Sequence, residues 1–470
     1  MNILCGLNLT PFEWTMSNEV AGSLMEFVVR LCCTGPVDVD LFNQAIVVAL
    51  KQQPLLQANA TVGPTHFASC WRPASNTQPI IKWFDGDPTL GRGVTDEFQP
   101  IELENEIGFR FYGWQNLLQG EPKTEMRFVF QHACCDGKGA FDFVEDVLFQ
   151  YQNLQTGNSD EAMRSFDDDR IVDRDKHASH SFNIVDRIWR TLIVRPKRAA
   201  NMLLNSPLSL ESRAKSNQQD VTDTPRQCSA TLDIETTEKL GVCASSLGAT
   251  TNLVLARELF HVLGDFLERS GVMANDSSDN LVRMLIPFSL RSETHQRMPA
   301  ANCVSMAYFE TKLDTLVHDT AKSPVLLADL VKQLAFIRRW KLQYSWIESI
   351  KSYARLWPLI RLFKRKSQKN NRFSGQQIAT TVLTNLGRVF KSGVLPESDG
   401  VIKIGSLKIE AAHLVVPCNA RQCVNFSVNF YCNRLTLDVS YLPSVVTREA
   451  AQQLLDSWQS RILAAIQKSS

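Results

Sequence analysis

The 470-residue sequence predicts an α/β protein with two halves of similar size. Short apolar segments typical of strands recur between longer segments that have the 3.6-residue period of amphipathic helices. This order appears in residues 1–205 and again in residues 228–470. Residues 206–227 between them are rich in Ser, Asn, Gln and Asp, which is typical of a linker. Since the chain exceeds the size of one ordinary domain, we expect two α/β domains, 1–205 and 228–470.

The first half alternates strands with helices. Apolar residues at Leu41, Ala45 and Val48 share one helical face and predict a helix over Val39–Gln53, which Pro54 ends. A similar stripe predicts a helix over Ala140–Leu154, and a basic, partly helical segment is expected over Asn183–Leu204. Strands are expected at Phe27–Cys32, Gln78–Phe84, Gly108–Gly113 and Met126–Gln131.

The second half repeats this alternation after the linker. Helices are expected at Thr236–Ser246, Thr251–Leu267, Leu326–Trp357 and Thr447–Gln467, with Pro358 ending the third. Strands are expected at Cys228–Ile234, Leu281–Leu290, Asn302–Glu310, Thr380–Leu386, Lys403–Ile409, Val424–Phe430 and Arg434–Tyr441.

Charge and cysteine usage exclude several classes of protein. The formal net charge is +1, so the sequence predicts no nucleic-acid partner. The residues up to Pro11 lack the basic start and apolar stretch of a signal peptide, and no segment is long enough to span a membrane. The twelve cysteines include no Cys-x-x-Cys pair, which favours reduced thiols over disulfides or a metal centre. We therefore expect a cytoplasmic protein without a bound metal.

The loop His132-Ala-Cys-Cys-Asp136-Gly137 joins an expected strand to an expected helix. Two rigid flanking elements make such a loop a suitable place to present a catalytic side chain. A neutral imidazole has a pKa of about 6.5 and can take a proton from a hydroxyl or an amine at neutral pH. Asp136 can pair with a cation, and Gly137 permits a tight backbone turn. By residue types alone, a hydrogen-bonded core histidine and a helix-capping aspartate explain the loop equally well.

Several further segments, in order along the chain, resemble one enzyme family. With the His132-x-x-x-Asp136-Gly137 loop, they resemble the acyl-CoA-dependent acyltransferase superfamily, which includes chloramphenicol acetyltransferase, non-ribosomal peptide condensation domains, alcohol acetyltransferases and wax ester synthases. The segments are Pro36–Ala45 leading to Gln53-Pro54-Leu55-Leu56, Leu247–Asn252, Ile286–Arg291 followed by Asn302, Thr384-Asn385-Leu386-Gly387, and Asn425–Tyr441.

The resemblance implies two chloramphenicol acetyltransferase-like domains that form a V with a tunnel between them. An acyl thioester of coenzyme A, or of the phosphopantetheine of an acyl carrier protein, would enter from one face as a substrate, with no cofactor bound permanently. A hydroxyl or amine acceptor, a small molecule or a lipid, would enter from the other. His132 would act as general base for direct attack without an acyl-enzyme. Asp136 would point away from the tunnel and brace the loop through an ion pair with Arg291.

The sequence departs from parts of the family pattern. Gln131 precedes His132, where condensation domains and wax ester synthases usually carry a second histidine. The Asp-Phe-Gly-Trp-Gly motif of the plant enzymes is absent. These departures favour a free-standing enzyme of the alcohol-acetyltransferase type. A stand-alone condensation enzyme that uses carrier-protein donors, and a non-catalytic relative that binds acyl carriers or membranes, remain open alternatives.

Five further polar residues are candidates for supporting roles. Asn385, Asn425 and Ser427 lie in segments that the family places near the tunnel, and each could stabilise an oxyanion or simply bond a strand end. His295 and His413 could act as additional bases, although isolated histidines are more often structural.

Two segments combine positive charge with apolar side chains. Lys351–Arg372 carries eight Lys or Arg and no acidic residue, and Asn183–Arg198 is a second segment of this type. Either could bind the phosphates of coenzyme A, an acidic carrier protein or a membrane surface, or could be an ordinary solvated face. We expect peripheral membrane contact, if any, through 351–372. We expect a monomer, because the two halves of one chain would complete the site.

Overall fold

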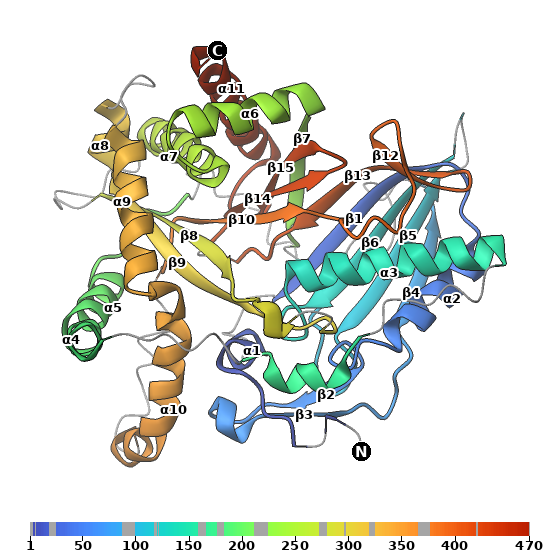
Figure 1. The fold of residues 1–470 in the computed structure, drawn as a ribbon, viewed down its shortest axis with the longest axis horizontal. Coiled ribbons are helices and arrows are strands. Elements are labelled where there is room, and N and C mark those ends of the chain that lie inside the picture. The colour runs from blue at the N-terminus through green and yellow to red at the C-terminus, as the bar shows by residue number, and fades with distance from the viewer. Residues whose placement is uncertain are drawn as a thin grey trace.

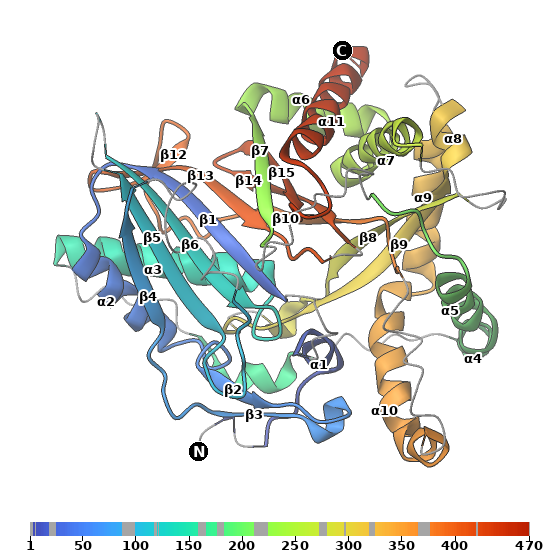
Figure 2. The same cartoon turned by 180° about the vertical axis from the view of Figure 1, so that it is seen from behind.

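Two large sheets, each covered by helices, organise the protein (Figure 1). They lie next to each other in the view of Figure 1 and in the opposite view of Figure 2. The computed structural model describes residues 3–4, 6–17, 25–86, 99–116, 120, 122–157, 166–175, 183–210, 224–271, 280–295, 298–318, 325–364, 377–419 and 422–469.

The first sheet has seven strands in the order β11-β12-β13-β1-β6-β5-β4. Helices α2 (Val39–Leu50) and α3 (Gly137–Thr156) cover one of its faces, where the ring of Phe42 packs against Phe111 and Phe128. Figure 2 shows the opposite face. The strands are β1 Glu26–Thr34, β4 Ile80–Asp85, β5 Phe109–Asn116, β6 Lys123–Gln131, β11 Glu397–Ser398, β12 Val401–Ile404 and β13 Leu407–Val415.

The second sheet has six strands in the order β7-β15-β14-β10-β8-β9. Helix α11 (Arg448–Ser469) buries Trp458 against Phe426 of this sheet, and its indole N–H donates to the Leu255 carbonyl 3.1 Å away. Helices α6 (Ile234–Ser246) and α7 (Thr251–Arg269) pack beside α11 (Figure 1). The strands are β7 Arg226–Leu232, β8 Leu281–Ser289, β9 Val304–Lys312, β10 Thr381–Arg388, β14 Val424–Tyr431 and β15 Arg434–Tyr441.

Each sheet receives elements from the other half of the sequence. Strand β13 pairs antiparallel with β1 from Val28↔Val415 to Thr34↔Lys408, so a late segment extends the first sheet. This pairing satisfies the backbone groups along an edge of β1 that would otherwise be exposed. Conversely, the segment 184–204 packs on the second half, where Arg190 Nε donates to the Trp340 carbonyl at 2.6 Å. Of the expected linker 206–227, residues 211–223 lie outside the described residues.

Two expected elements differ in the structure. The single strand expected at Lys403–Ile409 is a hairpin of β12 and β13, because Gly405 adopts a φ of 58° and reverses the chain. The single helix expected at Leu326–Trp357 is divided into α9 (Val325–Arg339) and α10 (Ser345–Lys364), because Lys341 between them adopts a φ of 50°. Helix α10 continues through Pro358, which removes only one backbone donor from the helix. The remaining elements are α1 Pro11–Ser17, β2 Ala58–Thr61, β3 Cys70–Pro73, α4 Ile184–Trp189, a π-helical turn Arg190–Val194, α5 Arg195–Leu204, α8 Leu313–His318 and short 3-10 turns at His66–Ala68, Asp168–Asp173, Glu293–His295 and Leu342–Tyr344.

None of the helices in the described part of the chain combines the length and the apolar character that a membrane crossing requires.

Candidate active site

The His132 loop is held by the first sheet and by helix α3, as the sequence predicts. The backbone N–H of His132 donates to the Met25 carbonyl at 2.9 Å, which continues the pairing of β1 with β6 by one residue. At the other end of the loop, Asp136 is the N-cap of α3, and its Oδ1 accepts from the Gly139 amide at 2.9 Å. The Phe27 ring packs on the imidazole with a centroid distance of 5.0 Å.

The second sheet holds the same loop through Asp136. Arg291, which follows β8, places Nη1 2.5 Å from Asp136 Oδ2, and the Cys303 amide donates to this oxygen at 2.9 Å. The ion pair expected between Asp136 and Arg291 is therefore present. Burial raises the pKa of Asp136, but the charge and hydrogen bond of Arg291 outweigh it and hold this pKa below its usual value. The carboxylate is charged and is bound by α3 on one side and by the segments next to β8 and β9 on the other.

Asn302 holds His132 directly. Its Nδ2 donates to the His132 carbonyl at 2.7 Å and lies 3.3 Å from Nδ1 of the imidazole. Burial lowers the pKa of His132, and the carbonyls of His132 and Cys135 together with Asp136 oppose this only in part. The imidazole is therefore neutral near pH 7, which is the form that a general base requires. Asn302 belongs to a sequence segment that resembles the family, but its contact with His132 depends on how β9 packs against the loop.

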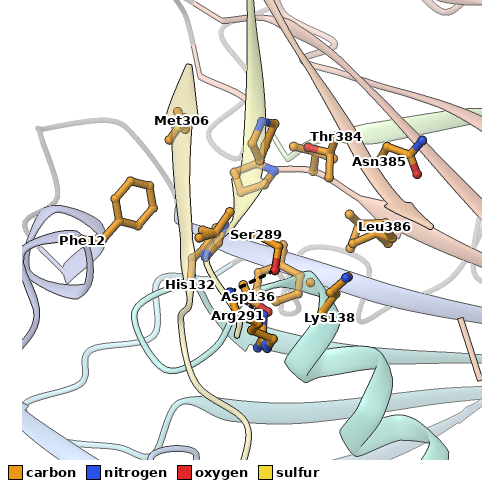
Figure 3. A pocket seen from close by; sticks show the side chains of 17 residues that line it. Phe12, His132, Asp136, Lys138, Ser289, Arg291, Met306, Thr384, Asn385 and Leu386 are labelled. Atoms are coloured by element: carbon orange, nitrogen blue, oxygen red, sulfur yellow. Dashed lines mark hydrogen bonds and ion pairs between the residues drawn. The ribbon is translucent and has the colours of Figure 1, made fainter. Parts of the chain in front are cut away.

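His132 lies on a pocket that both sheets line (Figure 3). Figure 3 shows Phe12 and Met306 on one side of His132 and Thr384, Asn385 and Leu386 on the other. The space amounts to about 700 Å³, including the part that is open to solvent. Its lining residues are Phe12, Phe27, His132, Asp136, Gly137, Lys138, Pro287, Ser289, Arg291, Val304, Met306, Thr384, Asn385, Leu386, Leu414, Val416 and Pro417.

Gly137 serves a different purpose from the one expected. It is the first residue of α3 and is not among the glycines with positive φ, so no special turn requires it. A methyl group at this position would instead come within 2.7 Å of Leu386 Cδ2. The absent side chain thus leaves room for the second sheet to approach the loop.

Of the three candidate oxyanion donors, the structure places one on the pocket and two away from it. Asn385 lines the pocket, and its Oδ1 accepts from the Gly387 amide at 2.7 Å while its amide nitrogen donates to Asn252. Ser427 is fully buried and donates to the Leu414 carbonyl at 2.9 Å, so it does not reach the pocket. Asn425 donates to the Pro417 carbonyl at 2.7 Å, so its side chain also bonds a backbone group and not the pocket.

The two additional histidines lie outside this pocket. His295 Nδ1 accepts from the Ser292 amide at 3.0 Å, which stabilises a short turn. His413 is buried beside Asp438, with 2.9 Å between Nδ1 and Oδ1. Neither supplies a second base to the His132 site.

Gln131, where part of the family carries another histidine, has a structural position. Its side chain is buried, with Nε2 donating to the Met16 carbonyl at 3.1 Å and Oε1 accepting from the Ala133 amide at 2.5 Å. It therefore fixes α1 against the loop. Since Phe12 of α1 lines the pocket, this amide also helps to shape one of its walls.

Comparison with solved structures identifies the fold. The trichothecene 15-O-acetyltransferase TRI3 from Fusarium sporotrichioides matches with a TM-score of 0.68 and 12% identity over 97% of this chain and 95% of that one. The starter condensation domain of rhizomide synthetase RzmA, in complex with C8-CoA and Leu-SNAC, matches with a TM-score of 0.62 and 14% identity over 98% and 94%. The epimerization domain from the third module of tyrocidine synthetase B matches with a TM-score of 0.62 and 14% identity over 98% and 96%.

These likenesses span almost the whole length of every chain compared. No protein-family model matches the sequence, and no curated protein matches it. At such low identities the likeness establishes the fold alone. The α/β fold shared by acetyltransferases and condensation domains, which the sequence predicts by resemblance, is confirmed.

Proposed function

We propose that the protein is an acyltransferase that moves an acyl group from a thioester to a hydroxyl or amine acceptor. The observation that carries this proposal is a neutral histidine, braced from two sheets, on the wall of a pocket that both sheets line. Most side chains that line the pocket are apolar, which suits an acyl chain and a hydrophobic acceptor. Both sheets of one chain line the pocket, so we propose that a monomer is sufficient.

In this proposal His132 moves one proton in each direction. Its unprotonated ring nitrogen takes the proton of the acceptor O–H or N–H while the acceptor atom attacks the thioester carbonyl carbon. The C–S bond of the tetrahedral intermediate then breaks, and the imidazolium returns the proton to the departing thiolate. Amides of the first turn of α3, at Gly137 and Lys138, are free of helical hydrogen bonds and can stabilise the oxyanion. Asp136 and Arg291 keep the loop in place and move no proton.

We propose coenzyme A as the carrier of the acyl group. Lys138 lines the pocket, and Lys391 lies near enough to lower its pKa, so these two cations can bind the phosphates of coenzyme A; Arg291 is already paired with Asp136. A carrier-protein donor is the alternative. If Lys138→Gln raises the KM for an acyl-CoA but not for the matching acyl-pantetheine, the coenzyme A assignment is supported. Equal effects on both donors contradict it.

The test of the reaction is acyl transfer by the purified chain with a panel of acyl-CoAs and cellular alcohol and amine extracts, followed by mass spectrometry. His132→Gln should lose almost all turnover while keeping the far-ultraviolet circular dichroism of the wild type. His66→Gln, which changes a buried histidine outside the pocket, is the matched control and should retain activity. Equal turnover by His132→Gln contradicts the role of the histidine. Acyl-CoA binding by the wild type without turnover favours the non-catalytic alternative.

A surface on α4 and the turn that follows it favours membrane contact, in the second of the two segments that combine positive charge with apolar side chains and not in 351–372. Residues 365–372 of the expected segment 351–372 lie outside the described residues. In contrast, Ile184, Val185, Ile188, Trp189 and Leu192 are between 50% and 77% exposed. Their spacing places them along one helical stripe.

We propose that this stripe docks on an anionic lipid surface. Arg187 and Lys197 on the same segment are exposed and supply charge complementary to anionic headgroups. Ile188→Asp should abolish flotation with phosphatidylserine vesicles, whereas Val242→Asp, at an exposed apolar position on α6, should not. Equal flotation of the two variants contradicts the proposal, and flotation with neutral vesicles alone contradicts the role of charge.

A further inference from the structure

A second group of reactive side chains lies on the face of the first sheet that faces away from α2. Along β1, Val29 and Leu31 are buried in the core, whereas Arg30 and Cys32 alternate with them and are half-buried. Arg30 lies opposite His413 of β13 in the register of the sheet. Asp438, from β15 of the second sheet, reaches the same place. The group therefore forms where the two sheets meet.

The contacts in this group form a chain from carboxylate to thiol. Asp438 is fully buried, and its Oδ1 lies 2.9 Å from Nδ1 of His413, while Oδ2 accepts from the Leu414 amide at 3.3 Å. The His413 imidazole lies near enough to Cys32 to lower the pKa of the thiol. Arg30 Nη2 lies 3.6 Å from Cys32 Sγ. Arg30 therefore contacts the sulfur atom, and His413 lies close to it.

The charges around the sulfur favour the thiolate. Burial lowers the pKa of His413, but the Asp438 carboxylate and the Cys32 side chain outweigh it and raise this pKa to about 9. Burial raises the pKa of Cys32, but the hydrogen bond from His413 and the charge of Arg30 outweigh it and lower this pKa. Glu125 opposes this effect, although it also pairs with Arg30 at 3.2 Å.

The other cysteines of the described chain provide the contrast. Only Cys32 and Cys70 among them are half-buried, and the rest are buried. Burial raises the pKa of Cys33, Cys134 and Cys135 well above the usual range, which keeps them as inert thiols. Cys32 differs because it combines partial exposure with a histidine, a buried carboxylate and an arginine.

We propose that Cys32 is a modification site, a reactive thiolate that forms mixed disulfides with low-molecular-weight disulfides such as oxidised glutathione. The Cys32 thiolate attacks one sulfur of the disulfide, a new S–S bond forms, and the original S–S bond breaks. The second sulfur leaves as a thiolate, which takes a proton from water. The cysteine sulfur is oxidised and the leaving sulfur is reduced, so the electrons balance.

This site is separate from the His132 pocket. The register of the first sheet pairs Glu26 with Gln131, next to His132, and Cys32 lies six residues further along β1. At the rise of a β-strand this separation is about 20 Å. The proposal therefore does not depend on acyl transfer, and its test does not use that activity.

The experiment labels the native full chain with a trace of iodoacetamide from pH 5 to 9.5 and quantifies Cys32 and Cys70 in the same molecules by peptide mass spectrometry. An ordinary thiol with a pKa of about 8.5 is only about 0.3% thiolate at pH 6. Cys32 should therefore react at least about tenfold faster than Cys70 at pH 6, and the two rates should converge near pH 9. His413→Gln should remove this advantage, whereas the control Arg127→Gln, on the same face, should keep it.

Oxidised glutathione at pH 7 should add one glutathionyl group at Cys32, which dithiothreitol removes and Cys32→Ser prevents. Because the wild-type comparison of Cys32 with Cys70 needs no variant, misfolding of His413→Gln would not obscure the result. If the two cysteines share one pH dependence, or if Cys32 is alkylated at pH 6 but forms no mixed disulfide, the proposal is overturned. The group is then only an ionic tie between the sheets.

Discussion

Replacing Asp136 with Asn tests how strongly the His132 loop depends on its contacts with α3 and the second sheet. The carboxylate is 6% exposed, and Oδ2 binds Arg291 and the Cys303 amide while Oδ1 caps α3 through Gly139. In one orientation the asparagine oxygen keeps the cap on α3, but the NH₂ group then faces Arg291 and the Cys303 amide, which are both donors. In the other orientation the NH₂ group faces the Gly139 amide, and the cap is lost. Breaking one partner of a buried ion pair costs about 3–5 kcal/mol. Because Arg291 retains 22% exposure, we expect the lower end, about 3 kcal/mol.

The measurement is the free energy of unfolding from urea denaturation, together with kcat for acyl transfer. Asp38→Asn is the matched control, since Asp38 caps α2 through the Leu41 amide at 3.0 Å and is exposed. Asparagine is as good a cap as aspartate, so the control should change by only about 0.5 kcal/mol or less. Adding Arg291→Gln should recover part of the loss, because the unpaired charge is then absent. An Asp136→Asn protein as stable as the control, or strictly additive losses, would refute the reasoning.

Three further outcomes follow from the same geometry. Burial lowers the pKa of His132, and the neutral ring is the active form. The value of kcat/KM should therefore stay constant as the pH falls to about 6.5 and below. A decrease of kcat/KM at acidic pH with an apparent pKa above about 6.5 contradicts this. Gly137→Ala should lower kcat by displacing Leu386, and Leu386→Ala should relieve that defect in the double variant; purely additive losses of kcat argue against the contact. The His413 ion pair, with a pKa of about 9, stabilises the fold fully below pH ~6.5 and is lost as the pH rises toward 9. In the wild type the lowered pKa of Cys32 opposes this change, so the measurement uses Cys32→Ser, in which Asp438 still raises the pKa of His413. The urea midpoint of Cys32→Ser should fall across this range and that of Cys32→Ser/His413→Gln should stay level; parallel curves would show that another group is responsible.

Local patterns predicted most elements but not how they assemble. The stripe in Val39–Gln53 predicts a helix because its residues lie within a few turns of one another, and α2 occupies Val39–Leu50. The hairpin of β12 and β13 was not predicted, since apolar residues alternate with Lys and Ser on both sides of Gly405 and resemble one continuous strand. The addition of β13 to the first sheet could not be predicted either. It depends on which sheet has a free edge near that segment after folding.

The residues of the candidate site were likewise predicted only in part. The sequence, with its family resemblance, predicted His132, Asp136 and the pairing with Arg291. It also placed Ser427 near the pocket, but Ser427 instead bonds the Leu414 carbonyl. Asn302 was not predicted to touch His132, because that contact depends on the packing of β9.

By itself the sequence determined the alternation of strands and helices, the α/β class and the position of the His132 loop. These properties depend on residues close together in the chain, where hydrophobic period and backbone preference act directly. Only the tertiary structure decided that Gly137 makes room for Leu386, that α4 exposes an apolar stripe, and that Cys32 meets His413 and Asp438. Those contacts join residues from different strands and sheets, and the register and packing that bring them together leave no local pattern in the sequence.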